Sequence, residues 1–99
     1  VEMRHLEILG KLIKALGCRP IYADCNYHDI LYWNGDYVYY DMDLKTILEI
    51  NIESEQQAIY NYQMVMSVLD DIYLKENIAR ILEDEYLHLE IFCKLKENL

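Results

Sequence analysis

The sequence lacks the features of membrane, disulfide-rich and disordered proteins. None of its apolar runs reaches the roughly 18 residues that a membrane-crossing helix needs. One proline and three glycines among 54% hydrophobic residues exclude a collagen-like or disordered chain and favour a packed, mainly helical protein. The three cysteines form no Cys-x-x-Cys pair, so we expect free thiols in a reducing compartment.

Positive charge is scarce as well. Eighteen Asp and Glu residues against nine Lys and Arg residues give a formal net charge of -9. Such a chain repels nucleic-acid phosphates and anionic lipids, so we expect neither nucleic acid nor a membrane as a partner. With 99 residues, the chain is expected to form a single domain.

Three segments have the residue spacing of amphipathic helices. Apolar residues recur there at three- and four-residue steps, which predicts helices over residues 1–16, 43–69 and 71–97. Gly17 followed by Pro20 is typical of the end of a helix, because glycine adopts the left-handed conformation and proline cannot continue the helix. Asp41 and Asp43 are both candidate N-caps of the second helix.

The second and third predicted helices are joined by a short link around Asp70 and Asp71. A link of this length predicts an antiparallel helical hairpin. The apolar stripes of the two helices run from Leu44 to Leu69 and from Leu74 to Leu95, and we expect them to form the inner faces.

Residues 17–42 form a long connection without helical periodicity. Within it the stretch ILYW-NG-DYVYY alternates around Asn34-Gly35, and both turn residues tolerate positive φ. We therefore expect a crossover loop that carries a small β-hairpin.

Each predicted helix carries ionisable residues on its apolar face: Glu2 with His5, then Glu55, then Glu85 with His88. Burying an unpaired carboxylate costs several kcal/mol, and a domain with a total stability of about 5–15 kcal/mol cannot hold three of them uncompensated. The predicted inner faces contain no Lys or Arg. Protons or metal ions therefore remain as the compensating charges.

The spacing of these residues favours metal ions. Glu and His three residues apart project from one helix face, so both reach one ion, and a carboxylate from a neighbouring helix can bridge to a second ion. Mixed carboxylate and imidazole ligands suit iron first and manganese next, with zinc as an adventitious occupant. We therefore predict that two metal ions are bound by Glu2, His5, Glu55, Glu85 and His88.

The motifs EMRH, ESEQQAIYNY and DEYLH resemble the second-, third- and fourth-helix motifs of the ferritin-like carboxylate-bridged di-metal proteins, which include rubrerythrin, bacterioferritin and manganese catalase. The resemblance covers nearly the whole chain and implies an all-α, ferritin-like four-helix bundle. It also implies that Asp84 accepts the Nδ1 proton of His5 across the site. Tyr62, two turns from Glu55, is a candidate hydrogen-bond donor to a ligand carboxylate. The alternatives are that Asp84 is an ordinary solvated acid and that Tyr62 is an ordinary core residue whose hydroxyl has a hydrogen-bond partner.

The N-terminal sequence EMRHLEIL recurs as EYLHLEIF from Glu85 onward, as a duplicated helical hairpin would give. By that symmetry Glu2 needs a partner like Glu55, which would lie ahead of Val1. We therefore expect residues 1–99 to be a ferritin-like domain fragment that lacks the first helix and part of the second. An exposed apolar seam would follow, so we expect a homo-oligomer, in the first place a dimer that completes the bundle.

The resemblance implies a non-haem di-iron or di-manganese oxidoreductase that acts on peroxide or dioxygen, as in peroxide detoxification in an oxygen-sensitive cytoplasm. The chain has no rubredoxin-type cysteines, so a reductive peroxidase would need a separate electron donor. Two alternatives remain open. One is a ferroxidase that stores iron, and the other is a non-catalytic helical interaction module whose buried Glu and His residues form only hydrogen bonds.

Overall fold

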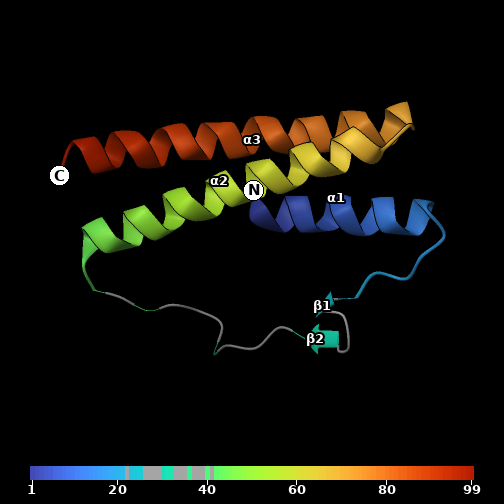
Figure 1. The fold of residues 1–99 in the computed structure, drawn as a ribbon, viewed down its shortest axis with the longest axis horizontal. Helices are drawn as coiled ribbons and strands as arrows, with labels where there is room; N and C mark the ends of the chain where they lie inside the picture. Colours follow the sequence, from blue (N-terminus) through green and yellow to red (C-terminus); the bar gives the residue numbers. More distant parts are fainter. Residues whose placement is uncertain (22, 26–29, 33–35, 37–39, 41) are drawn as a thin grey trace. The chain divides into compact units, whose positions relative to one another are not determined.

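The structure is a computed structural model, and it describes residues 1–21, 23–25, 30–32, 36, 40 and 42–99 (Figure 1). The chain divides into two units. The first unit, residues 2–40, contains helix α1 and strands β1 and β2. The second unit, residues 41–99 together with Val1, contains helices α2 and α3.

Helix α1 spans Glu2–Ala15 and ends in a hydrogen-bonded glycine turn. The Gly17 N–H donates to the Lys14 carbonyl at 2.9 Å, and the Cys18 N–H donates to the Ile13 carbonyl at 3.1 Å. Gly17 has a φ of 83°, which glycine adopts without the steric penalty of a Cβ atom. The helix therefore ends at the glycine that the sequence indicates.

The two described strands form a small antiparallel sheet. Strand β1 spans Ala23–Cys25 and strand β2 spans Ile30–Tyr32, with Ala23 opposite Tyr32. The hairpin predicted from the sequence turns instead at Asn34-Gly35, which lies outside the described residues. Strand β2 could pair with a second strand along its other edge, so the hairpin around Asn34-Gly35 stays a prediction.

Helices α2, Leu44–Val68, and α3, Ile72–Glu97, lie side by side and antiparallel (Figure 1). Aspartate caps the N-terminus of each. The Thr46 N–H donates to Asp43 Oδ2 at 3.0 Å, and the Leu74 N–H donates to Asp71 Oδ1 at 3.0 Å. Asp43 is thus the cap of α2, while the other candidate, Asp41, lies outside the described residues.

The core of the second unit is the seam between α2 and α3. Its buried apolar residues are Leu48, Ile59, Leu74, Ile78, Ile81 and Leu82. The sequence also placed Leu44 and Leu95 on the inner faces, but they are 54% and 51% exposed, so that expectation is wrong for both. They lie at the end of the pair farthest from the connecting turn, where little of the opposite helix extends past them. In the described part of the chain, no helix combines the length and the apolarity that a membrane span requires.

Candidate metal site

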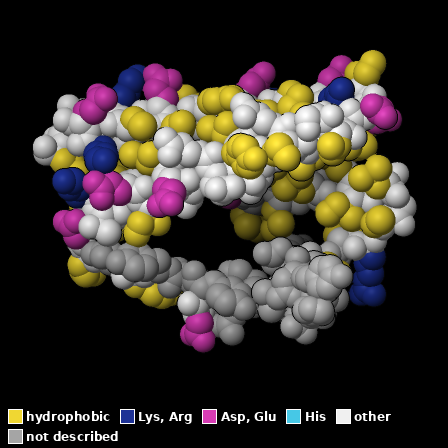
Figure 2. Space-filling view, in the orientation of Figure 1, with side chains coloured by type: hydrophobic (Ala, Val, Ile, Leu, Met, Phe, Trp, Pro, Cys, Tyr) yellow, Lys and Arg dark blue, Asp and Glu magenta, His cyan; other side chains and the backbone are white. Residues whose placement is uncertain are grey.

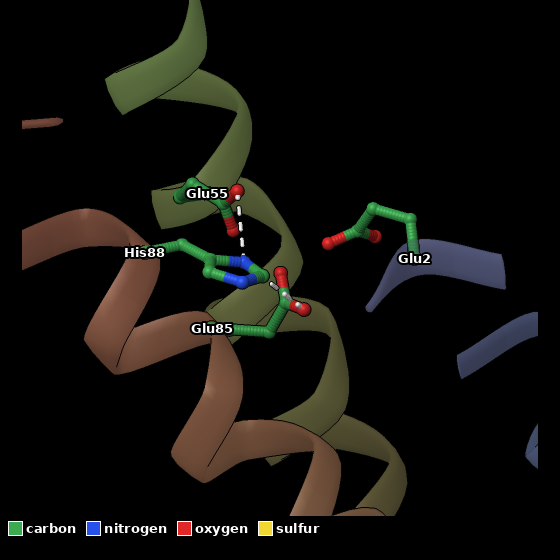
Figure 3. Close-up of side chains that lie close together, drawn as sticks. All are labelled: Glu2, Glu55, Glu85 and His88. Carbon is green, nitrogen blue, oxygen red and sulfur yellow. Dashed lines mark ion pairs between the residues drawn. The ribbon is translucent and has the colours of Figure 1, made fainter. Parts of the chain in front are cut away.

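Three ionisable side chains converge at the seam of the helix pair (Figure 3). Glu55 comes from α2, whereas Glu85 and His88 come from α3. One ligand atom of each lies within 4.8 Å of those of the others. Nδ1 of His88 lies 3.5 Å from Oε1 of Glu55 and 4.0 Å from Oε1 of Glu85.

Helical periodicity places the two α3 residues on the buried face. Residues three apart on an α-helix differ in direction by only about 60°, so Glu85 and His88 share a face. Ile78 and Ile81, one to two turns earlier, lie on the same face and are 3% and 0% exposed. The apolar stripe that packs α3 against α2 therefore also turns Glu85 and His88 toward Glu55.

The distances between these donor atoms are typical of ligands that share an ion. Both exceed the roughly 2.7–3.2 Å of an N–H···O hydrogen bond. Metal–ligand bonds of about 2.0–2.2 Å separate two ligands by about 3.0 Å at a right angle and by about 3.4 Å at the tetrahedral angle. The 3.5 Å between His88 Nδ1 and Glu55 Oε1 is close to the second value.

The site is largely removed from water. Glu85 is only 3% exposed, and the side chains of Glu55 and His88 are 14% and 19% exposed. Two carboxylates this close in a poorly hydrated seam repel one another, and the desolvation of each costs several kcal/mol. A divalent cation would offset both costs. Two carboxylates and an imidazole are ligands that iron and manganese accept, so the residues present fit such an ion.

Glu2 and His5, the other predicted ligands, lie on α1 in the first unit. Nδ1 of His5 lies 3.8 Å from Oε2 of Glu2, as their three-residue spacing allows. His5 is 3% exposed, whereas the Glu2 side chain is 70% exposed. Figure 3 also labels Glu2. That Glu2 and His5 bind the same ions as the ligands of the second unit stays a prediction.

Sequence reasoning missed a partner of Asp84. Nη1 of Arg80 donates to Oδ1 of Asp84 at 2.7 Å, one turn away on α3. Opposite charges four residues apart were a signal for this pair. The predicted hydrogen bond between Asp84 and His5 stays a prediction. Tyr62 is half-buried on α2, and its predicted hydrogen bond to a ligand carboxylate also stays a prediction.

Comparison with known proteins gives one family. A family model described as rubrerythrin matches residues 1–96, nearly the whole chain. No curated protein and no solved structure matches the chain. The helical structure is consistent with a ferritin-like fold, while the missing first helix of a four-helix bundle stays a prediction.

Proposed function

The chain belongs to the rubrerythrin family of ferritin-like di-metal proteins, and from this premise we propose that it is a non-haem di-metal oxidoreductase acting on peroxide or dioxygen. Iron is the proposed metal and manganese the second choice. The observation that carries the proposal is the convergence of Glu55, Glu85 and His88 in a poorly hydrated seam, at donor distances that suit a shared ion.

In this proposal five residues bind two ions. Glu2 and Glu85 would hold both ions, while Glu55, His5 and His88 would each hold one of them. The ion-binding groups of the second unit are the carboxylates of Glu55 and Glu85 and the Nδ1 atom of His88. The geometry around His88 supports this role, since its Nδ1 atom is the one that lies near both carboxylates.

Bound iron or manganese would supply the electron transfer and the open coordination positions for the oxidant. The residues of the chain hold the ligands in place and keep water away. Ile81 and Leu82, about one turn before Glu85 on α3, are buried, as Glu85 itself is. Low hydration strengthens every charge interaction at the site. We therefore expect the packing of α2 against α3, rather than a loop, to control the access of water and oxidant to the metal ligands.

The reaction type follows from electron balance. A peroxidase takes two electrons and two protons from a donor for each peroxide and yields two waters. A catalase converts two peroxides into two waters and dioxygen and needs no donor. The chain holds no second redox group that we identify in its described part, so a peroxidase would depend on a separate electron donor.

The test combines metal analysis with an activity assay on the purified chain. Elemental analysis and anomalous scattering at the iron, manganese and zinc edges identify the metal. Peroxide consumption is then measured with and without a reductant, using the Glu85→Gln variant as a control. Iron or manganese at the site and consumption that the variant loses would support the proposal.

Other outcomes favour the alternatives. A chain that retains neither iron nor manganese and consumes no peroxide would contradict the proposal and favour a non-catalytic helical module. A shell-sized assembly that oxidises and retains iron would favour storage.

A further inference from the structure

The five proposed metal ligands are divided between the two units of the chain. Glu55, Glu85 and His88 come from α2 and α3 in the second unit. Glu2 and His5 come from α1 in the first unit. Because each group belongs to its own unit, the two groups can differ in how firmly they hold an ion.

Two polar contacts show that the second unit sets its own helix register. Nζ of Lys96 lies 3.2 Å from Oε1 of Glu49, and nearer the connecting turn Nε2 of Gln63 donates to the Tyr86 hydroxyl at 2.7 Å. On α2, Glu55 lies between these two contacts. Each contact is exposed and contributes little energy, but both join α2 to α3 and neither involves α1. The register that brings the three donors together is therefore determined inside the second unit.

Positive charge lies on the surface of the helix pair and not in its seam. Figure 2 shows Lys and Arg side chains among the acidic ones on the visible face. Among the described residues, the buried polar side chains are His5 and Glu85, so no Lys or Arg is buried there. Folding has already removed Glu85 from water and placed it near a second carboxylate. An ion at the seam therefore relieves an existing repulsion with little further dehydration.

The α1 donors start from a different state. His5 is buried, but the Glu2 side chain is 70% exposed. An ion that binds Glu2 removes water from an exposed carboxylate and restricts a long side chain, and both changes are unfavourable. It also requires α1 to be held against the seam. These costs fall on whichever ion uses the α1 donors.

The charges of the ligands also distinguish one ion from two. The carboxylates of Glu55 and Glu85 balance a single divalent ion. In the proposed ligand set Glu2 adds one negative charge, whereas a second divalent ion adds two positive charges. The fully loaded site therefore has an excess positive charge, which is unfavourable in a poorly hydrated seam. Since affinity for a cation depends on ligand charge and on the rigidity of the site, the first ion is favoured over the second.

We propose that the helix pair is a self-contained site for one ion. Glu55, Glu85 and His88 bind the first ion without help from α1, and the second ion, which needs Glu2 and His5, binds at least about tenfold more weakly. This inference rests on the proposed function, because it uses the same ligand set. It predicts that the chain holds a single ion when metal is limiting.

The first test titrates the metal-free, full-length chain with Mn²⁺. The unbound ion is followed by its electron paramagnetic resonance signal, which measures binding and requires no turnover. One ion per chain should bind first, and a second should bind only at concentrations at least about tenfold higher. Two ions that bind together with equal affinity would overturn the proposal.

The second test separates the contributions of the two units. Glu2→Gln and His5→Ala should keep the affinity for the first ion within about threefold and lose the second ion. His88→Ala should weaken the first ion by about tenfold or more. Glu7→Gln, an exposed position on α1, is the control and should leave both ions unchanged. Loss of the first ion in Glu2→Gln would contradict a self-contained site, and this exposed position keeps the test valid if His5→Ala unfolds α1.

The outcomes separate this inference from the proposed function. One firmly bound ion in a chain that consumes no peroxide would contradict only the oxidoreductase. Two ions of equal affinity in a chain that consumes peroxide would contradict only the order of binding. A chain that binds neither Mn²⁺ nor, in the absence of oxygen, Fe²⁺ would contradict both.

Discussion

Nδ1 of His88 lies 3.5 Å from Oε1 of Glu55, although the two residues belong to different helices. The contact depends on how α2 and α3 pack, and neither helix alone provides it. Glu85 adds a second carboxylate from the same face of α3. The helix pair therefore holds a charged donor set within its own apolar seam.

Removal of a single donor should reduce metal binding. Glu55→Gln keeps the size of the side chain but removes its charge, and His88→Ala removes the imidazole. We expect either variant to lower metal affinity by about tenfold or more, as perturbation of a metal site commonly does. Elemental analysis after equilibration with limiting metal measures this. Glu53→Gln, on the exposed face of α2, is the matched control. Equal occupancy in all variants would show that the ligands are wrongly assigned.

Glu85 should cost stability in the metal-free protein. Glu85→Gln removes one of two carboxylates that share the seam, so the metal-free variant should melt at the same temperature as the wild type or higher. Metal should raise the melting temperature of the wild type, because a ligand at 100 times its Kd stabilises the folded state by about 2.7 kcal/mol. Thermal melts with metal and with chelator compare the two. A variant that metal stabilises as much as the wild type would contradict the role of Glu85.

Ile81 should be the most sensitive apolar position of the seam. It is fully buried, so Ile81→Ala should lower the free energy of unfolding by about 2–5 kcal/mol through lost burial and a cavity. Urea unfolding followed by circular dichroism measures the change. Ile72→Ala is the control, because Ile72 is 72% exposed and its truncation should cost no more than about 0.5 kcal/mol. Similar losses in both variants would argue against the seam as the core.

The cap of α2 should make stability depend on pH. The Thr46 hydroxyl donates to Asp43 at 2.6 Å and the Thr46 N–H at 3.0 Å, and these bonds lower the pKa of the Asp43 carboxyl from its usual 3.8. The stabilisation is therefore complete above the usual pKa and is lost as the pH falls through the lowered one. Asp43→Asn keeps a cap that does not titrate.

The wild type should therefore lose melting temperature relative to Asp43→Asn as the pH falls from about 5 to about 2.5, across and below the usual pKa of 3.8. Chelator is present in both samples, so that protonation of the metal ligands affects them equally. A difference that stays constant across this range would show that Asp43 does not contribute through its charge.

The family was predictable from the sequence, and the match to rubrerythrin over residues 1–96 confirms it. The motifs that carried the resemblance combine residue type with helical spacing, and both are properties of the chain alone. Sequence reasoning also named Glu55, Glu85 and His88, which the structure brings together. Their role as ligands stays a prediction. The prediction that Leu44 and Leu95 lie on the inner faces is wrong, because helical periodicity gives the direction of a side chain but not how far the opposite helix extends.

The sequence by itself determined the features that depend on neighbours within about four residues. The glycine turn that ends α1 and the aspartate caps of α2 and α3 close hydrogen bonds inside one turn, so local residue types are sufficient. The rotation and register of α2 against α3 depend on how side chains from distant segments fill one seam. Only the tertiary structure decided that Glu55 faces His88, because many registers of two apolar stripes bury similar area and side-chain packing selects one of them.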